Sequence, residues 1–322
     1  MTTPHVLVQL IDAAVEQDAA NEPPFRDHLG GSMIGEKCER KLVYSFRWAK
    51  APAFSGRILR LFNRGHLEEF RFVSYLRRIG AQVEEFSERL MYHPESDSYF
   101  TEPYDQLEPT EVTADDVSDD PKHVDRATAQ GITRKQWRIL DVDGHFGGSL
   151  DGKAYGVPGM PDLEEKILTE FKTHNTKSFV ELSNKGVAEA KPIHYVQMQI
   201  YMHKTGIKRA LYMAVNKNDD DLYCEWVEYD PAMGPPLLEK AARVIHAKKL
   251  PKRIGSNASW FDCKWCDYKT VCHFNEPMLR HCRSCAHSTP VAEGKWRCDL
   301  WQSIIPVDSI PLGCDSYTPI TD

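Results

Sequence analysis

Hydrophobic and polar positions recur along the chain with two periods, one typical of helices and one typical of strands. A helical period of about 3.6 residues is present in the ranges 6–19, 38–46, 58–79, 192–204 and 231–249. Shorter apolar runs bounded by turn residues predict strands at 136–142, 145–150, 167–173, 210–215 and 222–229. The dipeptide Asp143-Gly144 predicts a hairpin turn between the first two strands. Strands with helices before and after them predict an α/β fold, with a small mixed sheet flanked by helices.

The predicted helix at 58–79 has a broad apolar stripe, which we expect to face the core. The stripe consists of Ile58, Leu61, Phe62, Phe70, Val73 and Leu76. Gly80 is typical of the residue that ends such a helix.

Length and composition set wide limits. The chain has 322 residues, of which 41% are hydrophobic, enough for one large domain or one domain with an appendage. No apolar stretch approaches the ~20 residues that a membrane helix requires. The N-terminal region also lacks the basic start and the cleavage site of a signal peptide. We therefore expect a cytoplasmic protein that has no membrane partner.

Asp151 and the tripeptide Glu170-Phe171-Lys172 form the first candidate site. Alternate residues of a strand point to the same side, so Glu170 and Lys172 share a face. Two carboxylates can bind Mg²⁺ or Mn²⁺, and a lysine beside them can stabilise developing charge or help to deprotonate water. Each residue alone is equally typical of an ordinary protein surface. Their order on adjoining strands, about twenty residues apart, favours a catalytic metal site.

A first set of cysteines is divided between distant parts of the chain. Cys38 lies near the start, and Cys263, Cys266 and Cys272 follow with the spacing Cys-x2-Cys-x5-Cys. Four thiolates divided in this way can hold a 4Fe-4S cluster. Zinc is the alternative, although zinc sites usually take two ligands from each of two knuckles. Either metal would clamp the two ends of the intervening fold together, and we expect Trp260, Trp265 and Tyr268 to shield it from solvent.

A second set of cysteines, Cys282, Cys285, Cys298 and Cys314, follows directly. Four thiols among turn residues predict a small zinc module, with free thiols as the alternative. Cys224 belongs to neither set, and its place in a predicted strand suggests a core residue.

In combination, these motifs resemble the RecB-type branch of the PD-(D/E)xK nuclease superfamily, and within it the iron-sulfur exonucleases. These include CRISPR-associated RecB-like nucleases, AddB-like nuclease domains and phage exonucleases. The resemblance runs from about Gly35 to Cys272 and implies a restriction-endonuclease-like core. It makes Asp151, Glu170 and Lys172 catalytic and adds the peptide oxygen of Phe171 to the metal ligands.

Two further motifs depend on the same resemblance. Gln197 and Tyr201 match the Gln-x-x-x-Tyr motif of the family and would join the catalytic set, four residues apart on one helix face. The family also has a histidine or an acid four residues after a helical glycine, and after Gly65 this position is Glu69. Since the RecB pattern usually has histidine there, the helix ligand stays open between Glu69, Glu68 and His66.

The resemblance implies a metal-dependent deoxyribonuclease that acts at DNA ends, most simply an exonuclease. Single-stranded or frayed ends and a 5′ to 3′ direction are expected, in recombination, replication or phage DNA processing, with partner proteins from those pathways. A CRISPR adaptation-type nuclease working in a complex and an inactive DNA-end-binding assembly factor are the alternatives. We expect Arg40, Tyr44 and Arg64 to contact DNA, and Phe46 and Trp48 are further candidates for stacking on bases.

The distribution of charge qualifies the formal net charge of −7. Residues 94–125 contain eleven acids and one lysine, so the remainder of the chain is net positive. We expect this segment to be a solvated loop inserted in the nuclease domain, with an acidic flap over the basic groove as the alternative. The expected organisation is a helical extension at 1–30, the nuclease domain at 31–275 and the cysteine-rich module at 276–322.

Overall fold

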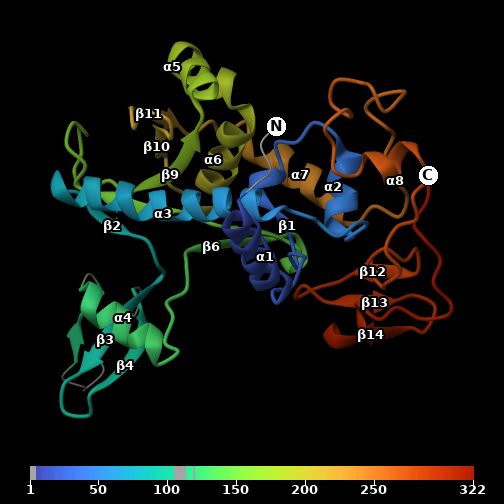
Figure 1. Ribbon diagram of the computed structural model, residues 1–322, viewed down its shortest axis with the longest axis horizontal. Coiled ribbons are helices and arrows are strands. Elements are labelled where there is room, and N and C mark those ends of the chain that lie inside the picture. The colour runs from blue at the N-terminus through green and yellow to red at the C-terminus, as the bar shows by residue number, and fades with distance from the viewer. Residues whose placement is uncertain (1–4, 105–113, 119) are drawn as a thin grey trace.

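The computed structural model describes residues 5–104, 114–118 and 120–322. Its centre is a five-stranded mixed sheet (Figure 1) with the strand order β11-β10-β9-β8-β2. The strands are β2 (Gln82–Glu84), β8 (Gly152–Tyr155), β9 (Ile167–His174), β10 (Arg209–Asn216) and β11 (Leu222–Glu228). Strands β9 and β10 are parallel, and the other neighbours are antiparallel. The mixed sheet was predicted, but β2 and β8 were not.

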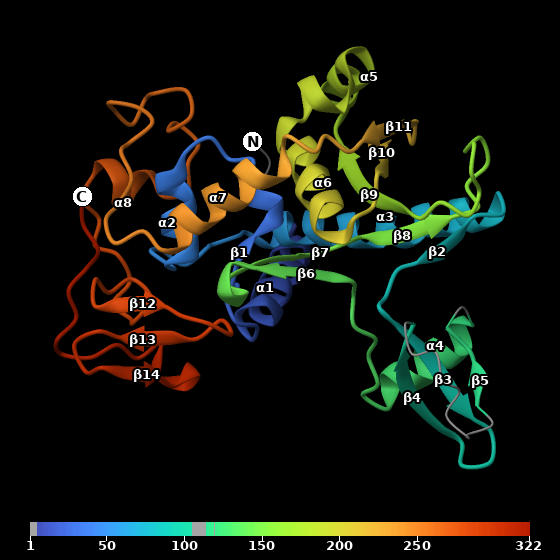
Figure 2. The same ribbon diagram turned by 180° about the vertical axis from the view of Figure 1, so that it is seen from behind.

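Helices cover both faces of this sheet, as predicted (Figures 1 and 2). Helix α3 (Gly56–Arg78) packs against β9 and β2 on one side. Helices α5 (Thr176–Ala190) and α6 (Pro192–Thr205) pack against β9 and β10 on the other side. Helix α7 (Gly234–Ile245) extends this layer and contacts α2 (Glu39–Phe46), whose N-cap is Cys38 and whose C-cap is Arg47.

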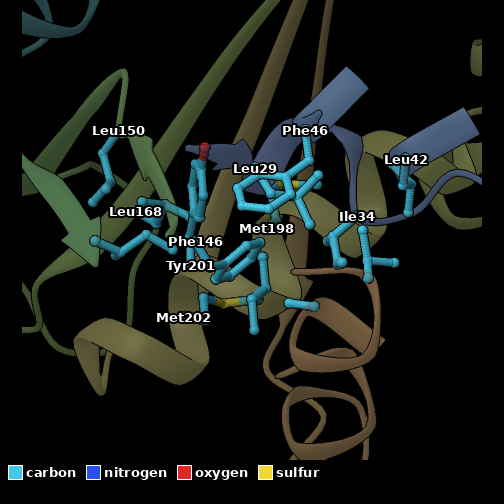
Figure 3. Close-up of a cluster of buried hydrophobic side chains, with 14 of the residues drawn as sticks. Leu29, Ile34, Leu42, Phe46, Phe146, Leu150, Leu168, Met198, Tyr201 and Met202 are labelled. Atoms are coloured by element: carbon cyan, nitrogen blue, oxygen red, sulfur yellow. The ribbon is translucent and has the colours of Figure 1, made fainter. Parts of the chain in front are cut away.

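The alternation of side chains along β9 divides the core into two clusters. Ile167 and Phe171 point toward α3 and join Phe72, Val73 and Leu76. Leu168 points the other way, into a larger cluster with α2 and α6 residues that include Phe46, Met198 and Met202 (Figure 3). Because the two clusters use alternate residues of one strand, Glu170 and Lys172 must lie on the α6 side.

The stripe predicted along α3 is correct only in its C-terminal half. Val73 and Leu76 are buried, but Phe62 and Phe70 are 45% and 60% exposed, and Phe72 takes the core position instead. The N-terminal half of α3 meets α1 (Val6–Ala20), a helix without a buried residue. The two helices approach closely at Gly56, where a Cβ atom would lie 2.5 Å from the Cα atom of Asp12.

A second sheet is formed by strands that precede β9 in the chain, apart from those of the main sheet. Strand β7 (Phe146–Ser149) pairs with β6 (Arg138–Asp141) and with the short β1 (Leu29–Gly30), next to the 3₁₀ turn Gly31–Met33. The predicted hairpin between β6 and β7 is confirmed, with the 3₁₀ turn Val142–Gly144 at its tip. Three successive residues of this turn have positive φ angles, which explains the use of aspartate and glycine.

The acidic segment is not simply the solvated loop that we expected. It contributes β4 (Ser98–Pro103), β5 (Asp115–Asp116) and α4 (Pro121–Ala129) to a small body that also includes β3 (Glu88–His93). Leu90, Tyr99 and Ala127 form its core, and it projects away from the main sheet in both views (Figures 1 and 2). Most of the acidic side chains that are described in this body are exposed to solvent. Residues 105–113 and 119 lie outside the described residues.

The C-terminal part contains the short helix α8 (Lys269–His273) and a three-stranded antiparallel sheet. The strands are β12 (Ser288–Pro290), β13 (Trp296–Cys298) and β14 (Ser303–Ile305), followed by the 3₁₀ turn Val307–Ser309. Cys224 was predicted to be a core residue, but it is exposed on the edge strand β11. None of the helices within the described ranges is both long and apolar enough to cross a bilayer.

Candidate active site

The site is built where the main sheet loses a strand. The ladder between β8 and β9 ends at the pair Gly152 and Thr169. Beyond this pair, the backbone N–H of Phe171 donates to Oδ2 of Asp151 at 2.8 Å. The side chain of Asp151 therefore replaces the missing strand partner, and the same hydrogen bond fixes its carboxylate beside β9.

Glu170 is the most deeply buried acid of the site. It has no exposed surface, and Nε2 of Gln197 on α6 donates to its Oε2 at 3.0 Å. Lys172 pairs with Glu170 through Nζ, which also lies 3.6 Å from Oδ2 of Asp151. The same Nζ donates to the carbonyl oxygen of Phe171 at 3.0 Å. Asp151, Glu170, Lys172 and Gln197 therefore lie together, and the Lys172 side chain remains 25% exposed.

Helix α3 supplies a third carboxylate, and the structure distinguishes between the three predicted candidates. Glu69 faces the site, close enough that Asp151 and Lys172 influence its ionisation. Glu68 is buried, but its carboxylate accepts from Arg71 at 2.7 and 3.0 Å, away from the site. His66 is mostly exposed, with Nδ1 at 3.5 Å from Oε1 of Glu69. Glu69 is thus the helix residue that shares the pocket, with His66 at its rim.

Burial and mutual repulsion shift the ionisation of these groups. Burial raises the pKa of Glu170, and the neighbouring carboxylates of Asp151 and Glu69 raise it further, against the opposing effect of Lys172. The pKa of Glu69 is raised for the same two reasons. Burial alone would lower the pKa of Lys172, but Glu170 and Asp151 outweigh it and raise the pKa, so this lysine is a cation. The site thus holds three carboxyl groups beside one lysine, and simultaneous ionisation of all three is unfavourable unless another cation is bound.

Glu69 and Lys172 line a groove of about 970 Å³, and Asp151 and Glu170 lie next to it, beside Nζ of Lys172. Cationic side chains that line it come from distant segments of the chain, namely Arg26, Lys172, Lys191 and Lys217. Histidines 28, 66, 174 and 194 line it as well. Arg26, Lys191 and Lys217 were not expected, because no spacing in the sequence relates them and only the fold brings them together.

An aromatic pair lies in the same groove. The rings of Phe54 and Phe62 meet edge to face, with 5.0 Å between their centroids. Both side chains line the groove and are 45% exposed. Phe62 precedes Glu69 by two helical turns and therefore shares its side of α3.

The predicted DNA contacts Arg40 and Tyr44 are wrong. Arg40 is 4% exposed and donates to the Tyr44 hydroxyl and to the Pro251 carbonyl, each at 3.0 Å, while Tyr44 is 2% exposed. Phe46 is buried as well, and Trp48 is partly buried under Phe25. These residues therefore hold the core together. Arg64 remains accessible, with a side chain that is 46% exposed and donates to the carbonyl of the groove residue Lys217.

Tyr201 lies on α6 one turn after Gln197 but does not reach solvent. Its hydroxyl lies against Gly148 of β7, where a Cβ atom would come within 2.3 Å of it. Its ring similarly fills the space next to Gly31. The structure therefore places Tyr201 behind the site, between α6 and the strand that leads to Asp151.

The two cysteine sets are each brought together by the fold. Cys38, Cys263, Cys266 and Cys272 line one small cavity, and Cys282, Cys285, Cys298 and Cys314 line another. Throughout the described ranges, however, no group of three or more His, Cys, Asp or Glu side chains has the arrangement of a metal site. Tyr268 lines the first cavity as predicted, but Trp260 and Trp265 are 47% and 82% exposed, so the shield we expected from them is not formed.

Comparison with known proteins gave weak similarities only. No family model matches the chain, and no curated protein matches it. An alkaline exonuclease from Laribacter hongkongensis, also solved in complex with dAMP, is 17% identical with a TM-score of 0.39, over 73% of this chain and 90% of its own. The protein SSO0001 is 12% identical with a TM-score of 0.39, over 83% and 96%. A phage-related exonuclease from Haemophilus somnus 129PT is 14% identical with a TM-score of 0.25, over 37% and 61%. Similarity at this level establishes no function, which must be inferred from the site.

Proposed function

We propose that this chain is a metal-dependent deoxyribonuclease of the PD-(D/E)xK type, acting as an exonuclease at DNA ends. One observation carries the proposal: Asp151 and Glu170 contact Lys172, which lines a groove together with Glu69 and further cationic side chains. Carboxylates that repel one another require a cation, and a cationic groove attracts a phosphate backbone.

The residues of the site fit Mg²⁺ or Mn²⁺. Glu69, Asp151 and Glu170 offer hard oxygen donors. The carbonyl oxygen of Phe171 lies near them and accepts a hydrogen bond from Nζ of Lys172. Oε1 of the fully buried Glu170 lacks a hydrogen-bond partner apart from its ion pair with Lys172. When bound, the ion would polarise the scissile phosphate and lower the pKa of an attacking water.

The protein groups have separate tasks in this proposal. Lys172 stabilises the negative charge that develops on the phosphate, because its pKa keeps it cationic. Gln197 holds one oxygen of Glu170 and so orients the other oxygen toward the pocket. The Phe171 N–H does the same for Asp151. Tyr201 is a positioning residue, because it supports Gly148 of β7, the strand that leads to Asp151.

The groove suits a single strand with accessible bases. Arg26, Lys191 and Lys217 can bind phosphates, and Arg64 donates to the backbone of Lys217 from the edge. The half-exposed rings of Phe54 and Phe62 can stack on unpaired bases, which a paired duplex would not offer. Single-stranded or frayed ends are therefore the proposed substrate, and the 5′ to 3′ direction follows from the family resemblance.

We assign the first cysteine set to a 4Fe-4S cluster with a structural role. Cys38 and the three cysteines around α8 line one cavity, although they are more than two hundred residues apart. A cluster there would close a very long loop and fix α2 against the C-terminal segment. Zinc in the same site is the alternative. The visible absorption spectrum of the purified protein distinguishes the two, because an iron-sulfur cluster is coloured and zinc is colourless.

The test is anaerobic purification, metal analysis and digestion of end-labelled single- and double-stranded DNA with Mg²⁺ or Mn²⁺. The proposal expects nucleotides to be released from linear single strands, no activity in EDTA, and circular single strands left intact. Cleavage of circular strands, which have no ends, would show that the protein is an endonuclease and not an exonuclease. Binding to ends without any release, with either ion, would leave an inactive end-binding protein.

A further inference from the structure

The last part of the chain, residues 276–322, has little apolar material with which to fold. Its three strands have three residues each, and its buried apolar side chains are Cys285, Trp296, Ile310 and Ile320. A unit of this size rarely acquires enough stability from its core alone and usually needs disulfides or a metal. All four of its cysteines are free thiols, so disulfide bonds do not stabilise this unit.

The fold brings the four cysteines of this unit to one small cavity. Cys282 and Cys285 form a tight turn, in which the Cys285 N–H donates to the Cys282 carbonyl at 3.1 Å. Cys298 ends β13, and Cys314 follows Gly313, whose positive φ angle turns the chain back toward His281. All four residues line the same cavity.

The neighbouring histidines are less suitable ligands. Nε2 of His281 lies 2.9 Å from the Trp48 carbonyl, and its Nδ1 accepts from the Ser284 N–H at 3.3 Å. Both ring nitrogens of His281 are therefore committed. His287 lines the cavity and could replace one thiolate, but the four cysteines already provide the four ligands that a structural zinc ion requires.

We propose that Cys282, Cys285, Cys298 and Cys314 bind one zinc ion, and that this zinc module holds one wall of the groove in place. The first half of the proposal is independent of the nuclease function. The second half rests on that function, because it assigns the groove to DNA.

Two buried arginines connect the zinc module to the rest of the chain, and each donates hydrogen bonds to carbonyls of the other part. Arg47, at the end of α2, donates to the carbonyls of Arg283, Cys285 and Ser288 at 3.1 to 3.2 Å. Arg283, from the module, donates to the carbonyls of Phe46 and Asp27. Each side chain is 1% exposed. Since a buried guanidinium is costly unless it is bonded, the two arginines fix the module and the core in one relative position.

This contact continues into the groove. The guanidinium of Arg283 lies 4.2 Å from the ring centroid of Trp48, and Trp48 stacks on Phe25 at 4.9 Å. Phe25, Arg26 and His28 line the groove, and Asp27 between them accepts from Arg283 at 2.9 Å. Residues 25–28 are therefore a groove wall that is supported from behind by the zinc module.

The first experiment counts metals in Cys298→Ser and Cys314→Ser, with Cys224→Ser as the matched control outside both cysteine sets. Wild type and the control should contain one zinc per chain, and the two variants should lose it while the iron content stays unchanged. Their melting temperatures should fall by several degrees. A wild type without zinc after growth in zinc-supplemented medium, or variants that retain it, would overturn the zinc site. Iron at this second site would overturn it as well.

If the variants do not fold, the native chain still tests the site. Cobalt substituted for zinc in the wild type should produce the intense ultraviolet charge-transfer bands and visible bands of a tetrahedral tetrathiolate. Bands of an octahedral oxygen-ligated cobalt would reject the assignment.

Arg283→Gln tests the groove wall separately. This variant should retain zinc but show a several-fold rise in KM for single-stranded DNA, with kcat nearly unchanged. If the variant has an unchanged KM and only a lower stability, Arg283 stabilises the fold but does not support the groove wall. If no variant or wild type cleaves DNA, the nuclease proposal has failed, while the zinc count still decides the zinc site.

Discussion

The two faces of strand β9 are built in opposite ways in its C-terminal half, beyond Thr169. On the α3 face, Phe171 stacks on Phe72 with 5.1 Å between ring centroids, in a cluster of apolar side chains. On the α6 face, β9 presents Glu170, Lys172 and His174, whose partners are polar. Buried polar groups stabilise a fold little and become costly when they lose a partner. In this half of β9, one face therefore supplies stability, and the opposite face holds the groups to which we assign the chemistry.

The largest expected effect comes from the polar face. Lys172→Ala and Glu170→Gln should each lower cleavage on the order of a thousandfold, because each removes a charge that the reaction requires. Rates on end-labelled DNA and circular dichroism measure activity and folding together. The exposed pair Lys185 and Glu189 on α5 provides matched controls, Lys185→Ala and Glu189→Gln, which should retain wild-type rates. Near wild-type cleavage by Lys172→Ala would remove this residue from the mechanism.

Substitutions on the apolar face should instead lower the free energy of unfolding. Phe72→Ala removes a ring that is 1% exposed and should cost about 3–5 kcal/mol in the free energy of unfolding. Phe70, two positions away on the same helix, is 60% exposed, so Phe70→Ala should change it by no more than about 0.5 kcal/mol. Urea denaturation followed by fluorescence compares them. Equal losses in the two variants would contradict the packing described for α3.

Gln197 tests how the polar face is oriented. Gln197→Met keeps the volume of the side chain but removes the donor to Glu170, so the carboxylate loses its orientation. We expect about a 10–100-fold loss of metal affinity or activity, as is typical when a group that orients a metal ligand is removed. A titration with Mg²⁺ should show half-maximal activity at a higher concentration. An unchanged metal titration with a lower rate would instead give Gln197 a direct role at the DNA.

The smallest expected effect belongs to Phe62, which the sequence assigned to the core and the structure assigns to the groove. Phe62→Ala should weaken single-strand binding by about 1 kcal/mol, or roughly fivefold, because stacking on one base is lost. Fluorescence anisotropy with labelled oligonucleotides measures this change. Leu67→Ala, at a position of α3 that is 57% exposed but outside the groove lining, is the control. An equal loss of affinity for fully paired duplex would contradict base stacking.

Much of the fold could be predicted from the sequence, because strong periodicity reports burial. The helices at α1, α2, α3, α6 and α7 and the strands β6, β7, β9, β10 and β11 were found from this signal. Strands β2 and β8 are three and four residues long, too short to form a pattern. The acidic segment was taken for a loop because its few core residues, among them Tyr99 and Ala127, are separated by polar ones.

The site could be predicted only where its residues are close along the chain. Glu170 and Lys172 follow from strand alternation, and Glu69 could be chosen over Glu68 only once Arg71 was seen to hold Glu68. The misassignment of Arg40 shows the limit of charge patterns: a helical arginine in the sequence does not reveal whether it meets solvent or the carbonyl of Pro251. Groove residues such as Lys217 have no local signal.

Helix α2 links the two thiol sets mechanically. Its N-cap is Cys38 and its C-cap is Arg47, so eight helical residues, about 12 Å long, form a stiff rod between them. Arg47 in turn donates to the carbonyl of Cys285, so both thiol sets are attached to the same short helix. If both sets bind metal as proposed, loss of one metal would free one end of α2 and weaken the support of the other set.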